Sequence, residues 1–386
     1  MKWLLLSIFW GLWFFNFSTR IIPSPVLPLI ENELMVSHAK AGGLFTFLYA
    51  GYAFSLLMAG SLAPKVGYKR CIIGGFLCSS SALFIVQYTY SYGQLALLFL
   101  LIGLGCGVYL PSIMPMITET FPREHWGKAI GIHDSAASLS IFSMPIYVAI
   151  GLHVFPWRRL FLFLCLASMV VVLLFWVVPQ EPRRERTPDI STSIEVLKKK
   201  ALWFMMPLWS VAAACCLGVY SIIPLFLVNE RGLSLGLANT VFGASRLGGI
   251  AVSICAGFLV DRLGVRRMLF LALFFTGLFT VGVSMARPFH LLVGVLFFQA
   301  TVALGFFPVG LATISKITTS SERSMATGIV IATGVIFGLG VAPYLLGAIA
   351  DRINFQTGIL LLGILTTLSS FSVKYLMDSR KGELTA

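Results

Sequence analysis

The feature that most constrains this chain is a short polar hairpin that occurs twice between long apolar runs. The first copy is GSLAPKVGYKR at residues 60–70, and the second is GFLVDRLGVRR at residues 257–267, an offset of 197 residues. The same offset superimposes four pairs outside the hairpin, namely Gly51 on Gly248, Pro111 on Pro308, Glu119 on Lys316 and Gly131 on Gly328. Because the register extends well beyond the hairpin, the sequence predicts two halves built to one plan.

Each hairpin combines glycines with a basic cluster. Glycine permits close helix contact and chain reversal, Asp261 can cap a helix or pair with a base, and the bases hold the turn on the cytoplasmic side. The residues that define the hairpin are Gly60, Lys65, Gly67, Lys69 and Arg70 in the first copy, and Gly257, Asp261, Arg262, Gly264, Arg266 and Arg267 in the second.

The runs between the hairpins are too apolar for a water-soluble protein. Hydrophobic residues make up 58% of the 386 residues and charged residues 11%, and the mean hydropathy is +0.91. A membrane span needs about 20 mostly apolar residues, so the chain has room for about twelve spans with short loops. We therefore predict an all-α membrane protein.

The twelve predicted spans group into two bundles. They cover residues 3–30, 41–62, 71–88, 94–118, 127–154, 157–178, 201–228, 235–260, 268–285, 291–315, 325–349 and 358–375. The start resembles a secretory signal but has no convincing cleavage site, so we expect it to remain as helix 1. We predict an N-terminal six-helix bundle at 1–178, a polar linker at 179–200, a C-terminal six-helix bundle at 201–375 and a tail at 376–386. Gly103, Gly105 and Gly107 suit tight helix packing in the fourth span.

The net charge of +13 reflects membrane orientation. Of the 28 Lys and Arg residues, our loop assignment places 20 on the cytoplasmic side, 6 outside and 2 within the membrane. This is the positive-inside pattern. It predicts a multi-pass protein of the cell inner membrane with both termini in the cytoplasm, and it requires no nucleic acid. The seven cysteines lack metal-ligand spacing, so we expect packing roles and no metal.

The hairpin resembles the signature loop of the major facilitator superfamily of secondary transporters, which joins helices 2 and 3 and, more loosely, helices 8 and 9. The second copy fits at every key position, whereas the first has Pro64 in place of the acid and Lys65 in place of the first arginine. The resemblance implies a transporter with two pseudo-symmetric six-helix bundles and alternating access, in which the residues that define the two hairpins act in gating. In that superfamily, acids at the end of helix 4 pair with the loop bases. Glu119 is thus expected to meet Lys65, Lys69 or Arg70 and to favour the outward-open state, and the alternative is a solvated loop charge.

Four ionisable residues lie deep in predicted spans: Arg20, His133, Asp134 and Arg246. Such a residue costs about 2.5 to 3.5 kcal/mol on insertion scales, so each is a candidate for function. Arg20, with Asn16 one turn away, resembles the helix 1 arginine of organophosphate and organic-anion transporters. Arg246 resembles the helix 8 arginine of monocarboxylate, oxalate and nitrate carriers. Because a guanidinium is a planar fork of donors, the two arginines are expected to clamp one anion. Structural ion pairing is the alternative for each.

His133 and Asp134 are the deep groups that change charge readily. Proton coupling is one interpretation, and an interfacial pair that helps to close the inner gate is the other. Further mid-span polar residues are expected to donate hydrogen bonds to a substrate or, alternatively, to make interhelical contacts: Tyr49, Tyr52, Tyr109, Tyr220 and Gln299.

These features together predict a monomeric secondary transporter for a small organic anion, with proton symport as the coupling. The deep charges sum to +1, which a monovalent anion, or a divalent anion with a proton, would neutralise. We expect no enzyme activity and no cofactor, because no Walker loop or nucleophile elbow occurs. Drug or metabolite efflux is the first alternative, although the fifth span lacks the Gly-x-x-x-Gly-Pro signature of that class. A transporter-shaped receptor is the second.

Overall fold

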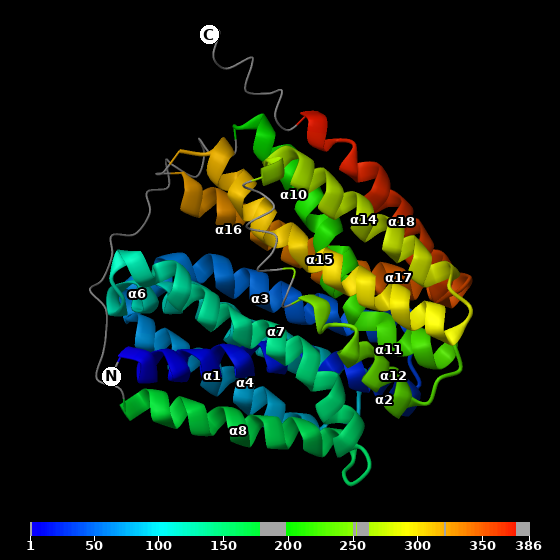
Figure 1. The fold of residues 1–386 in the computed structure, drawn as a ribbon. Coiled ribbons are helices and arrows are strands. Elements are labelled where there is room, and N and C mark those ends of the chain that lie inside the picture. The colour runs from blue at the N-terminus through cyan, green and yellow to red at the C-terminus, as the bar shows by residue number, and fades with distance from the viewer. Residues whose placement is uncertain (1, 178–197, 250–251, 253–261, 320–321, 376–386) are drawn as a thin grey trace. The chain divides into compact units, whose positions relative to one another are not determined.

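The computed structural model describes residues 2–177, 198–249, 252, 262–319 and 322–375 (Figure 1). Within these residues every regular element is a helix. Contacts between residues divide the chain into two compact units. Unit 1 contains Met1–Val36, Leu44–Pro188 and Ser234–Gly243, and unit 2 contains Ser37–Gly43, Asp189–Leu233 and Ala244–Ala386. The predicted bundle boundaries remain a prediction, since short segments of two helices pack with the opposite unit.

Unit 1 is built from the first helices of the chain. They are α1 (Lys2–Ile21), α2 (Pro23–Leu34), α3 (His38–Val66), α4 (Tyr68–Ile85), η1 (Val86–Tyr88), α5 (Tyr92–Gly107), α6 (Tyr109–Thr120), η2 (Arg123–His125), α7 (Trp126–Gly151) and α8 (Trp157–Val177), with α12 (Leu235–Ala244) from later in the chain. Helix α1 packs against α7 and α8, and α4 packs against α5 and α8 (Figure 1). Its apolar core includes Phe9, Trp13, Tyr109 and Phe175.

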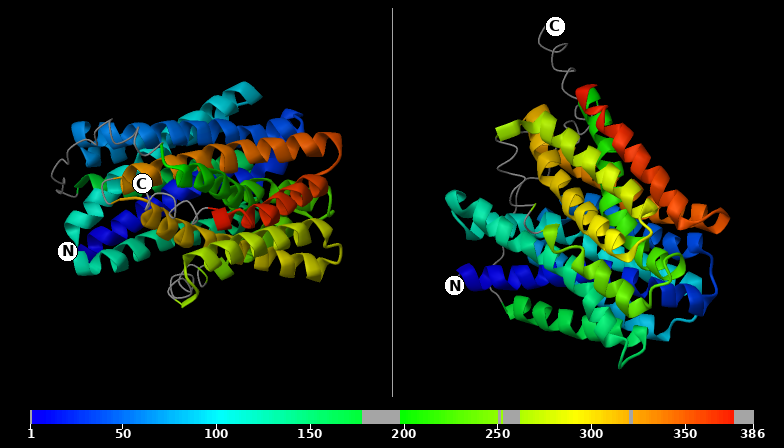
Figure 2. Two further views of the ribbon diagram at one scale, coloured as in Figure 1. Left: turned by 90° about the horizontal axis from the view of Figure 1, so that it is seen from above. Right: turned by 45° about the vertical axis from the view of Figure 1, so that its right-hand side comes forward.

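Unit 2 contains the remaining helices. They are α10 (Lys200–Ala213), η3 (Ala214–Gly218), α11 (Val219–Asn229), α14 (Val265–Met285), α15 (Phe289–Ile317), α16 (Arg323–Gly334), η4 (Val335–Val341), α17 (Ala342–Arg352) and α18 (Phe355–Ser370). Helix α14 packs against α15 and α18, and α10 packs against α16, as the two further views show (Figure 2).

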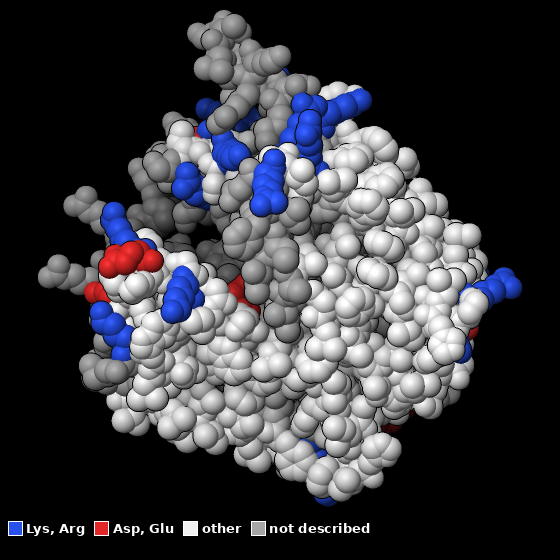
Figure 3. All heavy atoms as spheres, in the orientation of Figure 1, with Lys and Arg blue, Asp and Glu red and all other residues white. Residues whose placement is uncertain are grey.

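Eleven helices in the described ranges are long and apolar enough to cross a membrane. The remaining predicted span, residues 235–260, begins with α12, and most of its second half lies outside the described residues. On the face shown in Figure 3, Lys and Arg side chains gather around helix ends and the flank of the helices is mostly uncharged. This distribution is the one that a lipid-facing surface requires.

Several predicted spans are interrupted helices. The first span is divided at Ile22, because Pro23 has no N–H group to continue the hydrogen-bond ladder of α1. The fourth span is divided at Val108, three residues before Pro111. The seventh and eleventh spans contain π-helical segments, η3 and η4, in which each turn takes an additional residue.

Glycines set the closest helix contacts, as the sequence predicted for the fourth span. A Cβ atom on Gly103 of α5 would overlap the backbone carbonyl of Leu48 in α3, and one on Gly107 would overlap that of Tyr52. By contrast, a Cβ atom on Gly74 of α4 would meet nothing within 4 Å. Helices α3 and α5 therefore approach backbone to backbone, which only glycine permits.

The two hairpins have the same backbone geometry. Gly67 precedes α4 with φ 111°, and Gly264 precedes α14 with φ 78°. Side chains of L-residues rarely adopt this region, so glycine is required at both turns. The repeat that the sequence indicates is therefore present in the local structure.

Candidate functional site

Arg20 lies in the last turn of α1 inside an aromatic enclosure. Its side chain is 4% exposed. The guanidinium carbon lies 4.1 Å from the ring centre of Phe17, 4.6 Å from that of Tyr52 and 5.5 Å from that of Trp13. Such cation–π contacts stabilise the charge and leave the N–H donors available.

The donors of Arg20 are incompletely used. Within the described residues, its buried Nε and Nη2 atoms have no hydrogen-bond partner, and no ion pair to Arg20 is found. A buried guanidinium whose N–H groups lack hydrogen-bond acceptors is energetically unfavourable unless an acceptor binds to it. The arrangement is therefore suited to oxygen atoms of an anion.

The side-chain amide of Asn16, one turn earlier on α1, also uses only part of its hydrogen-bonding capacity. Its Nδ2 donates to the carbonyl of Cys106 at 3.0 Å, whereas its buried Oδ1 lacks a donor among the described residues. On α3, the buried rings of Tyr49 and Tyr52 lie 6.4 Å apart. Of the predicted substrate-binding residues, Tyr52 therefore contacts Arg20 through its ring. Asn16 makes an interhelical hydrogen bond to α5.

Arg246 follows α12 in the chain and belongs to unit 2. It is 3% exposed. Its Cζ lies 4.7 Å from the ring centre of Tyr220, and Nη1 donates to the carbonyl of Cys216 at 3.3 Å. Each unit therefore contains one buried arginine over a tyrosine ring, although the arginines come from different helices.

The carbonyl that Arg246 uses is available because of the π-helical segment η3. A π-type turn interrupts the regular i to i−4 ladder, so carbonyls in it are open to side chains. Gln299 uses the neighbouring one, since its Nε2 donates to the carbonyl of Cys215 at 2.8 Å and to Thr280 Oγ1 at 3.2 Å. Gln299 thus makes the interhelical contact that was one of its two predicted roles.

His133 is fully buried between α1 and α6. Its Nε2 lies 3.0 Å from the hydroxyl of Tyr109, and that hydroxyl donates to the carbonyl of Phe9 at 2.9 Å. Because the single tyrosine proton is used on Phe9, Nε2 must carry the proton of the His133–Tyr109 bond. Nδ1 is buried without a partner among the described residues. The hydrogen bond to Tyr109 therefore fixes the orientation of the His133 ring.

Asp134 points away from His133, because neighbouring helical residues are about 100° apart. Its side chain is exposed, and Oδ1 accepts a hydrogen bond from Trp13 Nε1 at 3.2 Å. The Trp13 ring also stacks on His133, with centres 5.6 Å apart and planes 14° apart. Since Trp13 contacts Arg20 as well, one indole contacts Arg20, His133 and Asp134, the three ionisable residues that the sequence places deep in the spans of unit 1.

Sequence analysis did not identify Trp13. A signal for it exists, because Trp13 lies seven residues before Arg20 and so occupies the same face of one helix. Phe17 lies between them on that face. An aromatic row leading to a buried arginine is the pattern that would have indicated the enclosure.

The predicted gating residues lie at helix ends, mostly exposed. Lys69 donates to the carbonyl of Trp176 at 2.7 Å, which ties the start of α4 to the end of α8. Exposed side chains at these ends include those of Lys65, Arg70, Glu119, Arg262, Arg266 and Arg267, and Gly60 is exposed too. Gly257 and Asp261 lie outside the described residues. The gating pairs of Glu119 therefore remain a prediction.

Apolar spans, a repeated hairpin and charged helix ends define a multi-pass membrane protein. A family model described as Major Facilitator Superfamily matches residues 9–289 and 218–385. The chain belongs to the major facilitator superfamily of transporters, and its described residues have the all-α membrane fold of that family. The family and the fold class predicted from the sequence are confirmed.

Individual relatives agree with the family assignment. The hexuronate transporter of Bacillus subtilis (strain 168) is 24% identical over 259 residues, which are 64% of this chain and 61% of the relative. The match therefore spans less than two thirds of that relative. A putative metabolite transport protein of Haemophilus influenzae (strain ATCC 51907 / DSM 11121 / KW20 / Rd) is 24% identical over 387 residues, covering 93% of this chain and 91% of the relative.

A solved structure has the same fold. It is a bacterial homologue of the human lysosomal transporter Spinster in an inward-facing and unoccupied conformation, with a TM-score of 0.81 and 15% identity. The likeness covers 98% of this chain and 97% of that one. At this identity the likeness shows the fold alone.

Proposed function

We propose that this transporter is a secondary active carrier of a small organic anion that bears a carboxylate or a phosphate. Transport is by alternating access and is coupled to proton uptake. The protein acts as a monomer in the cell inner membrane with both termini in the cytoplasm. The observation that carries the proposal is Arg20, a buried guanidinium on three aromatic faces with two open donors.

An anion is the occupant that the chemistry of Arg20 favours. A neutral solute would leave a buried charge uncompensated, whereas a carboxylate or phosphate accepts two parallel hydrogen bonds from the fork. Asn16 Oδ1 and the tyrosines of α3 add groups for substrate hydroxyls. Hexuronate, the substrate in the name of the B. subtilis relative, is an organic anion of this kind.

Arg246 is the second proposed anion ligand. It is buried over Tyr220, as Arg20 is over Tyr52. Its Nη1 contact to Cys216, at 3.3 Å, is at the long end for a hydrogen bond. A bound anion would compete well with this neutral acceptor, because hydrogen bonds between charged groups are about twice as strong.

Asp134 and His133 are the proposed proton-coupling residues. Asp134 accepts from Trp13, whose ring lies 5.5 Å from the Arg20 guanidinium. Protonation of Asp134 removes a negative charge beside the same indole, and so alters the electrostatic field at Arg20. His133 stacks on the Trp13 ring and so restricts its orientation.

Uptake into proteoliposomes tests the proposal. The panel contains monocarboxylates, dicarboxylates, sugar acids, sugar phosphates and inorganic anions, each with and without an inward proton gradient. We expect gradient-driven uptake of one anion class, lowered at least about tenfold in Arg20→Gln and in Arg246→Gln. Arg287→Gln, which removes an exposed arginine, is the matched control.

Three outcomes would contradict the proposal. Uptake that is equal in Arg20→Gln and the control removes Arg20 from the site. Proton-driven export of cationic or neutral drugs, without anion uptake, would identify the efflux antiporter. A flat response across both panels would favour a receptor that transports nothing.

A further inference from the structure

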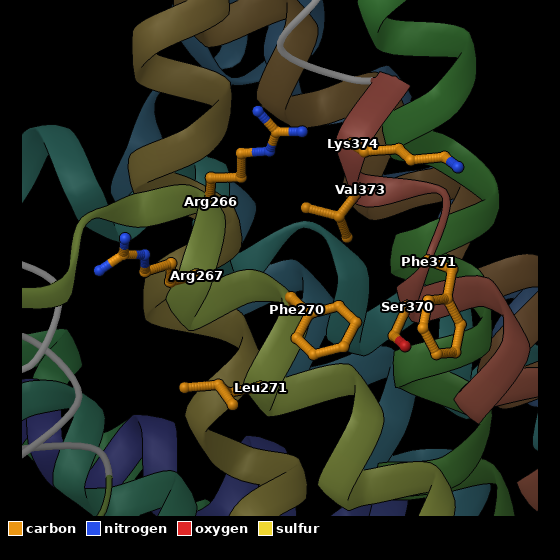
Figure 4. Close-up of a pocket in the computed structure, with 8 residues that line it drawn as sticks. All are labelled: Arg266, Arg267, Phe270, Leu271, Ser370, Phe371, Val373 and Lys374. Carbon is orange, nitrogen blue, oxygen red and sulfur yellow. The ribbon is translucent and has the colours of Figure 1, made fainter.

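A cavity of about 500 Å³ opens between the start of α14 and the end of α18 (Figure 4). Neither Arg20 nor Arg246 lines it. Its lining combines bases with apolar side chains, the principal ones being Arg266, Arg267, Lys374, Phe270, Leu271 and Phe371. No acid is among the described residues that line it. The cavity thus has a charge and an apolar surface in one place.

The charged and apolar parts of the cavity are separated. Phe270 and Phe371 form the apolar part, with ring centres 5.5 Å apart and planes at 72°. Figure 4 shows Arg266 extending from α14 toward the end of α18, where Val373 faces it and the Lys374 side chain extends away from Arg266. Arg266 and Lys374 are both exposed, so their charges are available to a ligand.

The position of the cavity matches a membrane boundary. Arg266 and Phe270 belong to the first turns of the α14 span, and Phe371 follows the last residue of α18. A ligand there meets water at one end and the hydrocarbon region at the other. A soluble anion would make no use of the phenylalanines, and an alkyl chain alone would make no use of the bases.

We propose that this cavity binds one anionic phospholipid. Its phosphate pairs with Arg266 and, after rotation of the exposed Lys374 side chain, with that ammonium as well. One acyl chain packs on Phe270, Leu271 and Phe371. Basic pockets between helices at the membrane surface have the charge that anionic headgroups require. Because Arg266 and Arg267 also belong to the second hairpin, a bound lipid contacts the loop to which we assign gating.

Native mass spectrometry of the purified full chain in detergent tests the proposal. The probes are dioleoyl phosphatidylglycerol and, as the zwitterionic comparison, dioleoyl phosphatidylcholine. We expect one phosphatidylglycerol to be retained more tightly than phosphatidylcholine. Each base removed near an anionic surface lowers affinity by about fivefold, so Lys374→Gln is weakened about fivefold and Arg266→Gln with Lys374→Gln more than about tenfold. Lys128→Gln, an exposed base of unit 1, binds as the wild type does.

A second variant separates the apolar contribution from the charge. Leu271→Trp fills the cavity while all bases remain, and we expect it to lose phosphatidylglycerol with an unchanged melting temperature. Excess inorganic phosphate should not displace the lipid. Equal retention of the two lipids, or unchanged binding in both the charge and the Leu271 variants, would overturn the proposal. Stronger lipid binding after truncation at Tyr375 would instead identify residues 376–386 as the occupant and overturn it too.

Discussion

Glu33 and Glu230 lie 197 residues apart, and each carboxylate accepts hydrogen bonds from the first residues of a later helix in its own unit. Glu33 accepts hydrogen bonds from Trp157 Nε1 at 2.8 Å and Arg158 Nη1 at 2.6 Å, at the start of α8. Glu230 accepts from the backbone N–H groups of Phe355 and Gln356, at the start of α18. The internal repeat therefore extends to tertiary contacts, which the two units make with different donors.

Glu230→Ala is expected to cost about 1 to 2 kcal/mol of stability, because it leaves two N–H groups at a helix N-terminus without their acceptor. Glu33→Ala should cost less than about 1 kcal/mol, since the Glu33 side chain is 42% exposed and its ion pair is partly solvated. Thermal unfolding in detergent measures both. A larger loss in Glu33→Ala than in Glu230→Ala would contradict this ranking.

Arg20→Lys tests whether geometry, beyond charge, matters at the proposed anion site. Lysine keeps the positive charge but cannot present a planar fork, so we expect substrate affinity to fall about tenfold with little change in melting temperature. Titration calorimetry with the transported anion measures the change. Full affinity in Arg20→Lys would show that the charge alone is recognised.

Asp134→Asn tests proton coupling. The amide can still accept from Trp13 but cannot be ionised, so we expect gradient-driven uptake to fall to the level without a gradient while exchange of substrate across the membrane persists. Counterflow and gradient-driven uptake, measured side by side, separate the two. Ser135→Ala, a change at the next exposed position, is the control. Retention of gradient-driven uptake by Asp134→Asn would exclude this residue from coupling.

Gly103→Ala should destabilise the protein by about 1 to 3 kcal/mol, because its Cβ overlaps the Leu48 carbonyl and the helices α3 and α5 must separate. Gly74→Ala is the matched control, since its Cβ meets nothing within 4 Å. We expect the control to be unchanged or stabilised by up to about 1 kcal/mol. The two variants are compared by thermal unfolding, and equal melting temperatures would refute the close contact.

Glu322, before α16, predicts a specific acid sensitivity. Its hydrogen bond from Lys199 at 2.6 Å, together with those from Thr319, lowers the pKa of Glu322 to about 2. A lowered carboxyl pKa stabilises the folded state above the ordinary value of about 4.3, and this stability is lost as the pH falls from there toward about 2. The effect should stay below about 1 kcal/mol for such a partly solvated pair. Melting temperatures of the wild type and Glu322→Gln should therefore converge over this pH range, and a constant difference would contradict the assignment.

The sequence predicted the fold well, because long apolar runs and a repeat constrain a membrane chain strongly. It located Arg20 and Arg246 by the cost of burying charge, and the structure places both in buried aromatic surroundings. It did not predict η3, since no residue type in ACCLG is specific for a π-type turn. Nor did the sequence show that His133 is buried and Asp134 is exposed, because that requires knowing which face of α7 contacts α1.

The π-helical segment η3 has a consequence for comparing the two halves. It stores one residue more than a regular helix of the same rise, so every side chain after it is rotated by about 100° around the axis. Arg20 lies eight residues before Pro28, and Cys216 lies eight residues before Pro224. The two positions therefore correspond in sequence, although their side chains project in different directions around the helix axis. Deleting a single residue within 214–218 would restore a regular helix and withdraw the carbonyls that accept from Arg246 and Gln299.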